Sequence, residues 1–240
     1  MDLTINIFLL LLGISILVWG ANKFVDHASV IAKHMGISDL VIGLTLIAFG
    51  TSAPEIFVGI SSIINQNEEI ALGTAIGSNI SNIALIFGVS CLYLTGPSKT
   101  QLWNLLPFGL SVALLGLTLA DGSISFNESM GFIGILMIFM FVLFKTDGLT
   151  EEDSADSNEF ARSLFMSLIG LIALIAGANI AVIYAENTAL LLGVPKLIIG
   201  LTIIALGTSL PELAATVVAL RKGKHQMVVG LSLIHISEPT

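Results

Sequence analysis

A stretch of thirteen residues occurs twice in this chain. Residues 43–55 read GLTLIAFGTSAPE and residues 200–212 read GLTIIALGTSLPE, with ten identical positions at a constant offset of 157. Each copy ends in a proline and a glutamate, Glu55 or Glu212, inside a segment apolar enough to span a bilayer. An ionisable side chain at membrane depth costs roughly 2.5 kcal/mol or more, so its presence there indicates a functional site. Two such glutamates at corresponding places of a duplicated chain predict one site built from two halves.

The composition predicts a membrane protein. Charged residues make up 11% of the chain and the mean hydropathy is +0.98, whereas about 25% charged residues is usual in a soluble domain. The net charge of −8, without a basic stripe, argues against a nucleic-acid partner. The predicted fold class is therefore all-α, a polytopic protein in contact with the lipid bilayer. Apolar runs of about 20 residues predict spans near 5–25, 38–64, 70–94, 101–120, 127–145, 163–185 and 197–220, with an eighth beginning near 226.

The basic residues predict the orientation of these spans. If the N-terminus lies outside, eight of the nine basic residues fall on the cytoplasmic side, and Lys196 is the exception. This bias agrees with the positive-inside rule. The eight are Lys23, Lys33, Lys99, Lys145, Arg162, Arg221, Lys222 and Lys224. The acidic segment 147–160 would then be a solvated cytoplasmic linker, with a regulatory cation site as the alternative.

The duplication also predicts how the two halves are related. The sequence Trp19-Gly20-Ala21-Asn22 aligns with Ala176-Gly177-Ala178-Asn179 at the same offset of 157, so each unit begins with its own long span. Five spans lie between equivalent points, and because five is odd, the second copy crosses in the opposite direction. We expect a first repeat over 1–146 and a partial second repeat over 161–230. Inverted repeats place their substrate site near the bilayer midplane, where helices are interrupted.

Each motif copy carries its own signal for such an interruption. A glycine and a proline stand in mid-span, at Gly50 and Pro54 in the first copy. A proline removes a backbone donor, so carbonyls near Ala48 and Ala205 are expected to be freed as oxygen ligands if they line a cavity. Further oxygens come from the hydroxyls of the two motifs and from a polar stretch over 73–82. The hydroxyls belong to Thr51, Ser52, Thr208 and Ser209.

These donors select the type of ion. The stretches hold no histidine or cysteine, which argues against zinc and copper. Carboxylates, hydroxyls, carboxamides and carbonyls suit Ca²⁺, which takes 6–8 oxygens in flexible geometry. Two glutamates would neutralise one Ca²⁺, and Na⁺ ions could occupy the same oxygens. For Gly73 and Gly77 taken alone, close helix packing is an equally good reading.

The motifs G-T-S-x-P-E, present twice, and G-x-x-x-G-S-N-x-x-N, over residues 73–82, resemble those of the sodium/calcium exchanger family within the cation/calcium antiporter superfamily. The resemblance extends over residues 1 to about 230 and points to a prokaryotic member. It implies inverted five-helix repeats with broken helices at the midplane, about eight spans being present of an expected ten. It also implies a multi-pass protein of the prokaryotic inner (cell) membrane, with Ca²⁺ and Na⁺ as transported ions and no cofactor. The implied Ca²⁺ site is centred on Glu55 and Glu212, with Na⁺ sites sharing these carboxylates. The remaining implied ligands are Ala48, Thr51, Ser52, Ser78, Asn82, Ala205, Thr208 and Ser209.

The end of the chain departs from this pattern. Ile234, His235 and Ile236 stand where the second repeat would continue with Gly-Ser-Asn, so we expect residues 231–240 to be a non-native tail of a truncated chain. The predicted function is Ca²⁺/Na⁺ antiport by alternating access. The alternatives are a Ca²⁺/H⁺ antiporter, a cation channel and a non-transporting fragment. The Asn-Ala-Ala-Glu motif typical of cation/proton relatives is missing from the two repeat motifs, which favours sodium. The oligomeric state is left open.

Overall fold

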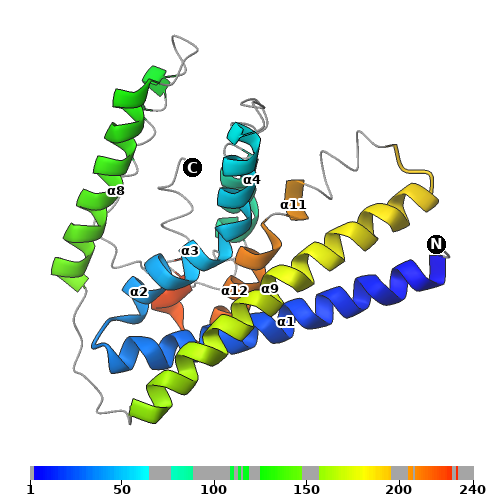
Figure 1. Ribbon diagram of the computed structural model, residues 1–240, viewed down its shortest axis with the longest axis horizontal. Coiled ribbons are helices and arrows are strands. Elements are labelled where there is room, and N and C mark those ends of the chain that lie inside the picture. The colour runs from blue at the N-terminus through cyan, green and yellow to red at the C-terminus, as the bar shows by residue number, and fades with distance from the viewer. Residues whose placement is uncertain are drawn as a thin grey trace.

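The computed structural model describes residues 3–64, 77–88, 109–110, 113–114, 116–118, 125–147, 157–195, 205–207, 209–228 and 231. Every element within these ranges is a helix, and the predicted all-α class is confirmed for them (Figure 1). Most of the predicted spans 101–120 and 70–94, most of the acidic linker, Thr208 and nearly all of the tail lie outside the described residues. The elements are α1 (Leu3–His34), α2 (Asp39–Ile42), the π-helical turn η1 (Gly43–Ile47), α3 (Ala48–Thr51), α4 (Ala53–Ile64), the π-helical turn η2 (Asn82–Phe87), α8 (Phe126–Asp147), α9 (Ser157–Leu191), α11 (Ala205–Gly207) and α12 (Leu210–Arg221).

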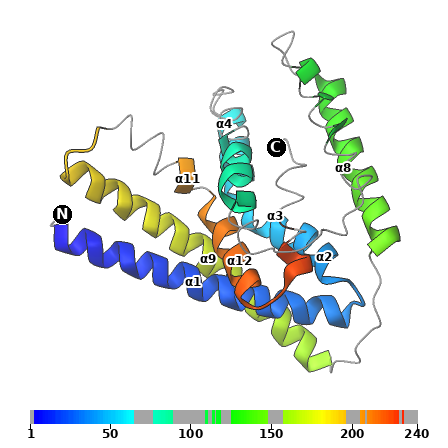
Figure 2. The ribbon, with the colours of Figure 1, turned by 180° about the vertical axis from the view of Figure 1, so that it is seen from behind.

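Helices α1 and α9 are the longest described elements and lie side by side in both views (Figures 1 and 2). Both are long and apolar enough to cross a membrane by length and composition. Each runs beyond its predicted span, 5–25 or 163–185. Hydropathy marks only the apolar part of a helix, whereas the hydrogen-bonded backbone continues into polar sequence, as α1 does through Asp26 and His27.

Four glycines line the contact between these two helices. A Cβ atom added to Gly13 would lie 2.7 Å from the Ala181 backbone nitrogen, and one added to Gly170 would lie 2.6 Å from the Phe24 nitrogen. Added Cβ atoms at Gly20 and Gly177 would also collide with backbone of the facing helix. Glycines of this kind let two helix backbones approach closely. The two helices therefore form one antiparallel unit held by direct backbone proximity.

The predicted span 38–64 is an interrupted helix. It begins with Ser38 as N-cap of α2 and passes through η1 into α3, which ends at Thr51. Ser52 leaves the helical conformation, with φ −81° and ψ 3°. Pro54 follows in the first turn of α4, where a missing N–H costs no helical hydrogen bond. The chain changes direction at this break (Figure 1).

The second motif copy is interrupted in the same way. α11 ends at Gly207, and Ser209 has φ −89° and ψ 5°, close to the values of Ser52. Pro211 stands in the first turn of α12. The predicted break within each copy is therefore present, at equivalent serines.

The outer surface of the described residues is apolar, unlike that of a soluble protein. Large apolar side chains such as Phe8, Phe141 and Phe165 are at least 60% exposed. Glu55 and Glu212, by contrast, are buried. Monomeric soluble proteins rarely expose apolar surface on this scale, whereas an apolar outer surface is the expected boundary with lipid.

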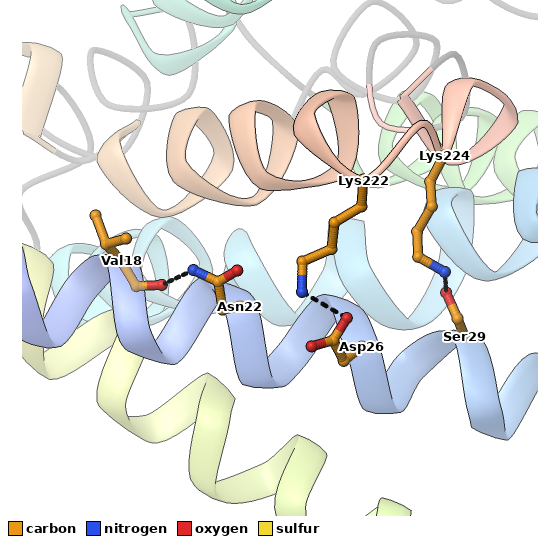
Figure 3. A network of polar contacts seen from close by, with 6 residues as sticks. All are labelled: Val18, Asn22, Asp26, Ser29, Lys222 and Lys224. Atoms are coloured by element: carbon orange, nitrogen blue, oxygen red, sulfur yellow. Dashed lines mark hydrogen bonds and ion pairs between the residues drawn. The ribbon is translucent and has the colours of Figure 1, made fainter.

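The end of α12 is attached to α1 by polar contacts (Figure 3). Lys222 Nζ lies 2.5 Å from Asp26 Oδ1, and Lys224 Nζ donates to Ser29 Oγ. Asp26 is half-exposed, so this ion pair contributes at most about 1 kcal/mol to stability. It connects α1 to the end of the helix whose first turn carries Glu212.

Candidate functional site

The two motif copies meet through a buried hydrogen bond. Ser52 Oγ, from the first copy, donates to Glu212 Oε1, from the second, at 3.1 Å. These residues are 160 positions apart in the chain, and both are buried. The breaks before α4 and α12 thus bring polar side chains from both halves of the duplicated chain to one place.

Glu55 and Glu212 form the charged centre of this place. Glu55 is 5% exposed and Glu212 is fully buried, and the two carboxyl groups interact electrostatically. Within the described residues, Glu212 Oε2 has no hydrogen-bond partner, and the one ion pair is the distant contact of Lys222 with Asp26. A buried charge is stable only when it is paired or when it coordinates a cation. Two buried carboxylates that interact with each other therefore make this place a candidate cation site.

Both motif copies also contribute buried hydroxyl groups. Thr51 is fully buried, and its Oγ1 donates to the carbonyls of Ile47 and Ala48 at 3.0 and 3.1 Å. A hydroxyl that donates still has lone pairs for a cation. Ser209 stands at the N-cap of α12 without making a cap hydrogen bond. Its buried Oγ has no partner among the described residues.

The expectation that a proline frees the Ala48 carbonyl is wrong. α3 stays helical through Thr51, so the Ser52 N–H donates to Ala48 O at 3.0 Å, and the Thr51 hydroxyl donates to the same oxygen. The donor that Pro54 lacks would reach the carbonyl four residues earlier, which belongs to Gly50. In the second copy the Ser209 N–H donates to Leu206 O at 3.2 Å and therefore does not use the Ala205 carbonyl.

The polar stretch 73–82 is described from residue 77 onward. Ser78 and Asn82 are 5% and 6% exposed, in helical residues 77–81 and at the start of η2. η2 packs against α12, the helix that carries Glu212. A π-helical turn inside a helix is frequently found at a functional site.

Two further hydroxyls are buried here: Ser81 belongs to the predicted polar stretch 73–82, whereas Thr216 was not predicted. Ser81 Oγ and Thr216 Oγ1 are buried and have no hydrogen-bond partner among the described residues. Thr216 could have been found from helical periodicity, because it lies four residues after Glu212 and hence on the same helix face. The sequence motif ends at the glutamate and gives no reason to look further along α12.

The glycine of each G-T-S motif has a packing role. A Cβ atom on Gly50 would lie 2.9 Å from the Phe24 ring of α1 and 3.2 Å from Leu171 of α9. A Cβ atom on Gly207 would collide with Val182 of α9. Both breaks are therefore seated against the α1–α9 pair.

The donor set of the site is made of oxygen atoms. The described residues contain no group of three or more His, Cys, Asp or Glu side chains that could hold a metal ion. Two carboxylates with neutral hydroxyls and a carboxamide are hard donors, which suit Ca²⁺ and other hard cations rather than zinc or copper.

The chain is similar to several known proteins. The chain matches the family described as "Sodium/calcium exchanger protein" over residues 5–145 and 162–233, which confirms the resemblance seen in the motifs. It is 48% identical over 100 residues to sodium/calcium exchanger MaX1 of Methanosarcina acetivorans, covering 42% of this chain and 28% of that protein. It is 33% identical over 159 residues to inner membrane protein YrbG of Escherichia coli, covering 62% of this chain and 49% of that protein.

The fold has a solved counterpart. The structure of a sodium/calcium exchanger from Methanococcus jannaschii superposes with a TM-score of 0.83 at 30% sequence identity, over 99% of this chain and 79% of that one. The matched region spans less than half the length of MaX1 and about half that of YrbG.

Proposed function

Because this chain belongs to the sodium/calcium exchanger family, we propose that the protein is a multi-pass antiporter that exchanges Ca²⁺ for Na⁺ by alternating access. The observation that carries this proposal is the hydrogen bond between Ser52 and Glu212. It joins the two motif copies into one buried site with two carboxylates. A channel would need a continuous polar pathway, whereas the buried polar side chains of the motifs gather at the two helix breaks.

The ligands that we propose follow from charge and burial. Glu55 and Glu212 together neutralise one Ca²⁺, and neutral oxygens complete its shell. Ala48 has the least support, because its carbonyl already accepts two hydrogen bonds. The other proposed ligands are Thr51, Ser52, Ser78, Asn82, Ala205, Thr208 and Ser209.

We propose sodium as the coupling ion because Na⁺ accepts the same hard oxygens as Ca²⁺. Occupation by Na⁺ and by Ca²⁺ would then exclude each other, and this competition is the basis of exchange. A Ca²⁺/H⁺ antiporter is the second candidate, since two buried carboxylates that interact can also take up protons.

The α1–α9 contact supports the inverted repeat. Gly20 lies against Leu174 and Gly177 lies against Leu17. At the offset of 157, Gly20 corresponds to Gly177 and Leu17 corresponds to Leu174, so exchanging the two halves turns one contact into the other. A contact that maps onto itself when its halves are exchanged is what a two-fold axis produces. The repeats would occupy 1–146 and 161–230, joined by the linker 147–160.

Transport of labelled Ca²⁺ tests the function directly. Proteoliposomes loaded with Na⁺ and diluted into Na⁺-free buffer should accumulate ⁴⁵Ca²⁺, because outward movement of Na⁺ drives Ca²⁺ inward. Vesicles with an imposed pH gradient and no Na⁺ gradient should not accumulate it. Uptake driven by the pH gradient alone would instead favour Ca²⁺/H⁺ antiport. Uptake in the absence of both the Na⁺ gradient and the pH gradient would favour a channel.

The proposed orientation predicts which positions can be labelled from outside. In a Cys91→Ser background, which removes the single native cysteine, Asn127→Cys should react with an impermeant maleimide in intact cells. Glu159→Cys should react only after the membrane is permeabilised. Both positions are exposed, so reactivity reports the side of the membrane. Labelling of the second variant in intact cells would reverse the orientation.

A further inference from the structure

One face of α12 carries a row of three buried oxygens. Ser209, Glu212 and Thr216 are spaced by three and four residues, which places them on one side of the helix. All three are fully buried. Ser209 Oγ, Glu212 Oε2 and Thr216 Oγ1 each have no hydrogen-bond partner among the described residues. The row extends one helical turn beyond the glutamate at which the sequence motif ends.

Thr216 differs from the other threonines of the described helices with printed side-chain contacts. Thr45 donates to Val41 O at 2.7 Å, Thr51 to Ile47 O at 3.0 Å and Thr188 to Tyr184 O at 2.6 Å. Each uses the carbonyl four residues earlier, which is the usual way in which a helical threonine satisfies its hydroxyl. Thr216 does not make this bond, so its hydroxyl oxygen is available to contact another partner.

The first half of the protein has no counterpart of this hydroxyl. The position equivalent to Thr216 at the offset of 157 is Gly59. The other two members of the row do have counterparts, Ser52 and Glu55. Thr216 is therefore an addition to one half of an otherwise duplicated oxygen set.

The spacing of Ser209, Glu212 and Thr216 predicts two separate cation positions along α12. Ser209 and Thr216 are seven residues apart, about 10 Å along the helix axis, which is too far for one cation to contact both. Glu212 lies between them and can share an ion with either. Because Ser52 occupies Oε1 of Glu212, the unpartnered Oε2 is the oxygen available for such an ion.

We propose that Thr216 Oγ1 contacts a Na⁺ ion held by Glu212 on the side of α12 that leads toward Lys222. This inference rests on the proposed function and assigns a residue that sets cation specificity within the same site. A single carboxylate balances a monovalent charge, whereas Ca²⁺ requires both Glu55 and Glu212. Beyond Thr216 the helix face continues with buried Ala219, so Thr216 is the last polar residue on that face of α12.

Replacement by an isosteric apolar side chain tests the proposal. Thr216→Val should raise the Na⁺ concentration for half-maximal exchange about five- to tenfold, the effect of losing one oxygen contact to an ion. The half-saturating Ca²⁺ concentration should change by less than about twofold, because Ca²⁺ is held by both carboxylates. Thr216→Ser, which keeps the hydroxyl, should retain Na⁺ dependence close to that of the unchanged protein.

Thermal stability distinguishes an ion contact from a structural role. In Na⁺- and Ca²⁺-free buffer, Thr216→Val should melt at the same temperature or higher, because it removes a buried hydroxyl that has no partner. Its Na⁺-induced increase in melting temperature should be smaller, as expected for weaker binding to the folded state. If the Thr216 hydroxyl had only a structural role, Thr216→Val would lower the melting temperature in both buffers.

Thr188→Val is the matched control, because its hydroxyl is already bonded within α9. It should leave the Na⁺ dependence of exchange unchanged. Unaltered Na⁺ dependence and unaltered Na⁺-induced stabilisation in Thr216→Val would overturn the inference. If Glu212→Gln still abolished transport in the same assay, the proposed function would stand and only the role of Thr216 would be wrong. If Glu212→Gln also had no effect, the proposed function itself would be wrong.

Discussion

Glu212→Gln and Glu55→Gln are each expected to reduce Na⁺-dependent Ca²⁺ transport by a factor of about 100 or more, from the cost of an uncompensated charge at membrane depth. Each carboxylate neutralises half of the charge of Ca²⁺ in a place where water cannot replace it. Glutamine has nearly the same shape, and its amide oxygen can still accept the Ser52 hydrogen bond. The fold should therefore survive. The measurement is ⁴⁵Ca²⁺ uptake into proteoliposomes, with protein yield and melting temperature recorded alongside.

Glu159→Gln is the control for these two variants. It removes one negative charge from an exposed position at the start of α9, so transport should be retained. Exchange at the rate of the unchanged protein in either site variant would refute a site that depends on paired carboxylates. Loss of transport in the control as well would show that the assay responds to net charge rather than to the site.

The features that were predicted from the sequence depend on local pattern. The breaks at Ser52 and Ser209 follow from a glycine and a proline inside an apolar span, and both are present in the structure. The meeting of the two motif copies follows from duplication, and Ser52 does contact Glu212. The breaks do not depend on how distant helices pack, so local residue order was sufficient to predict them. The meeting of the two copies was inferred instead from the symmetry of the duplication.

The features that were not predicted depend on packing. Nothing in residues 43–47 distinguishes a π-helical turn from an α-helix. In the structure, η1 begins at Gly43, which packs closely against Met227. A Cβ atom on Gly43 would lie 2.6 Å from the Met227 carbonyl oxygen. The freed carbonyl was assigned to Ala48 because the hydrogen bond of the Ser52 N–H could not be seen in the sequence. Thr216 was missed because the repeated motif ends at Glu212, and only the structure shows that its buried hydroxyl has no hydrogen-bond partner among the described residues.

The α1–α9 pair explains how the two motif halves keep their relative position. Gly50 of the first half contacts Phe24 and Leu171, and Gly207 of the second half lies against Val182. α12 also packs along α1, where Lys222 is paired with Asp26. The spacing between Glu55 and Glu212 is therefore set by two helices that carry neither glutamate. Any change that separates α1 from α9 should disturb the site as well as the fold.

The double variant Gly20→Ala, Gly177→Ala is expected to lower the melting temperature by roughly 5–20 °C, from an overpacking cost of about 1–3 kcal/mol at each position. Each added methyl group would meet the facing backbone, at Leu174 for Gly20 and at Leu17 for Gly177. Backbone atoms cannot move aside as a flexible side chain can, so the helices must separate along their length. Melting in detergent, followed by intrinsic fluorescence or a thiol-reactive dye on Cys91, measures the change.

Gly134→Ala in α8 is the matched control, since an added Cβ atom there meets nothing within 4 Å among the described residues. Alanine forms helices better than glycine by about 1 kcal/mol, so this variant should melt at the same temperature or slightly higher. Each of the three positions receives the same Gly→Ala change, and the positions differ in what faces the new methyl group. If the double variant were as stable as this control, close backbone contact would not be what holds α1 to α9, and the pair could not be the element that fixes the two carboxylates in one site.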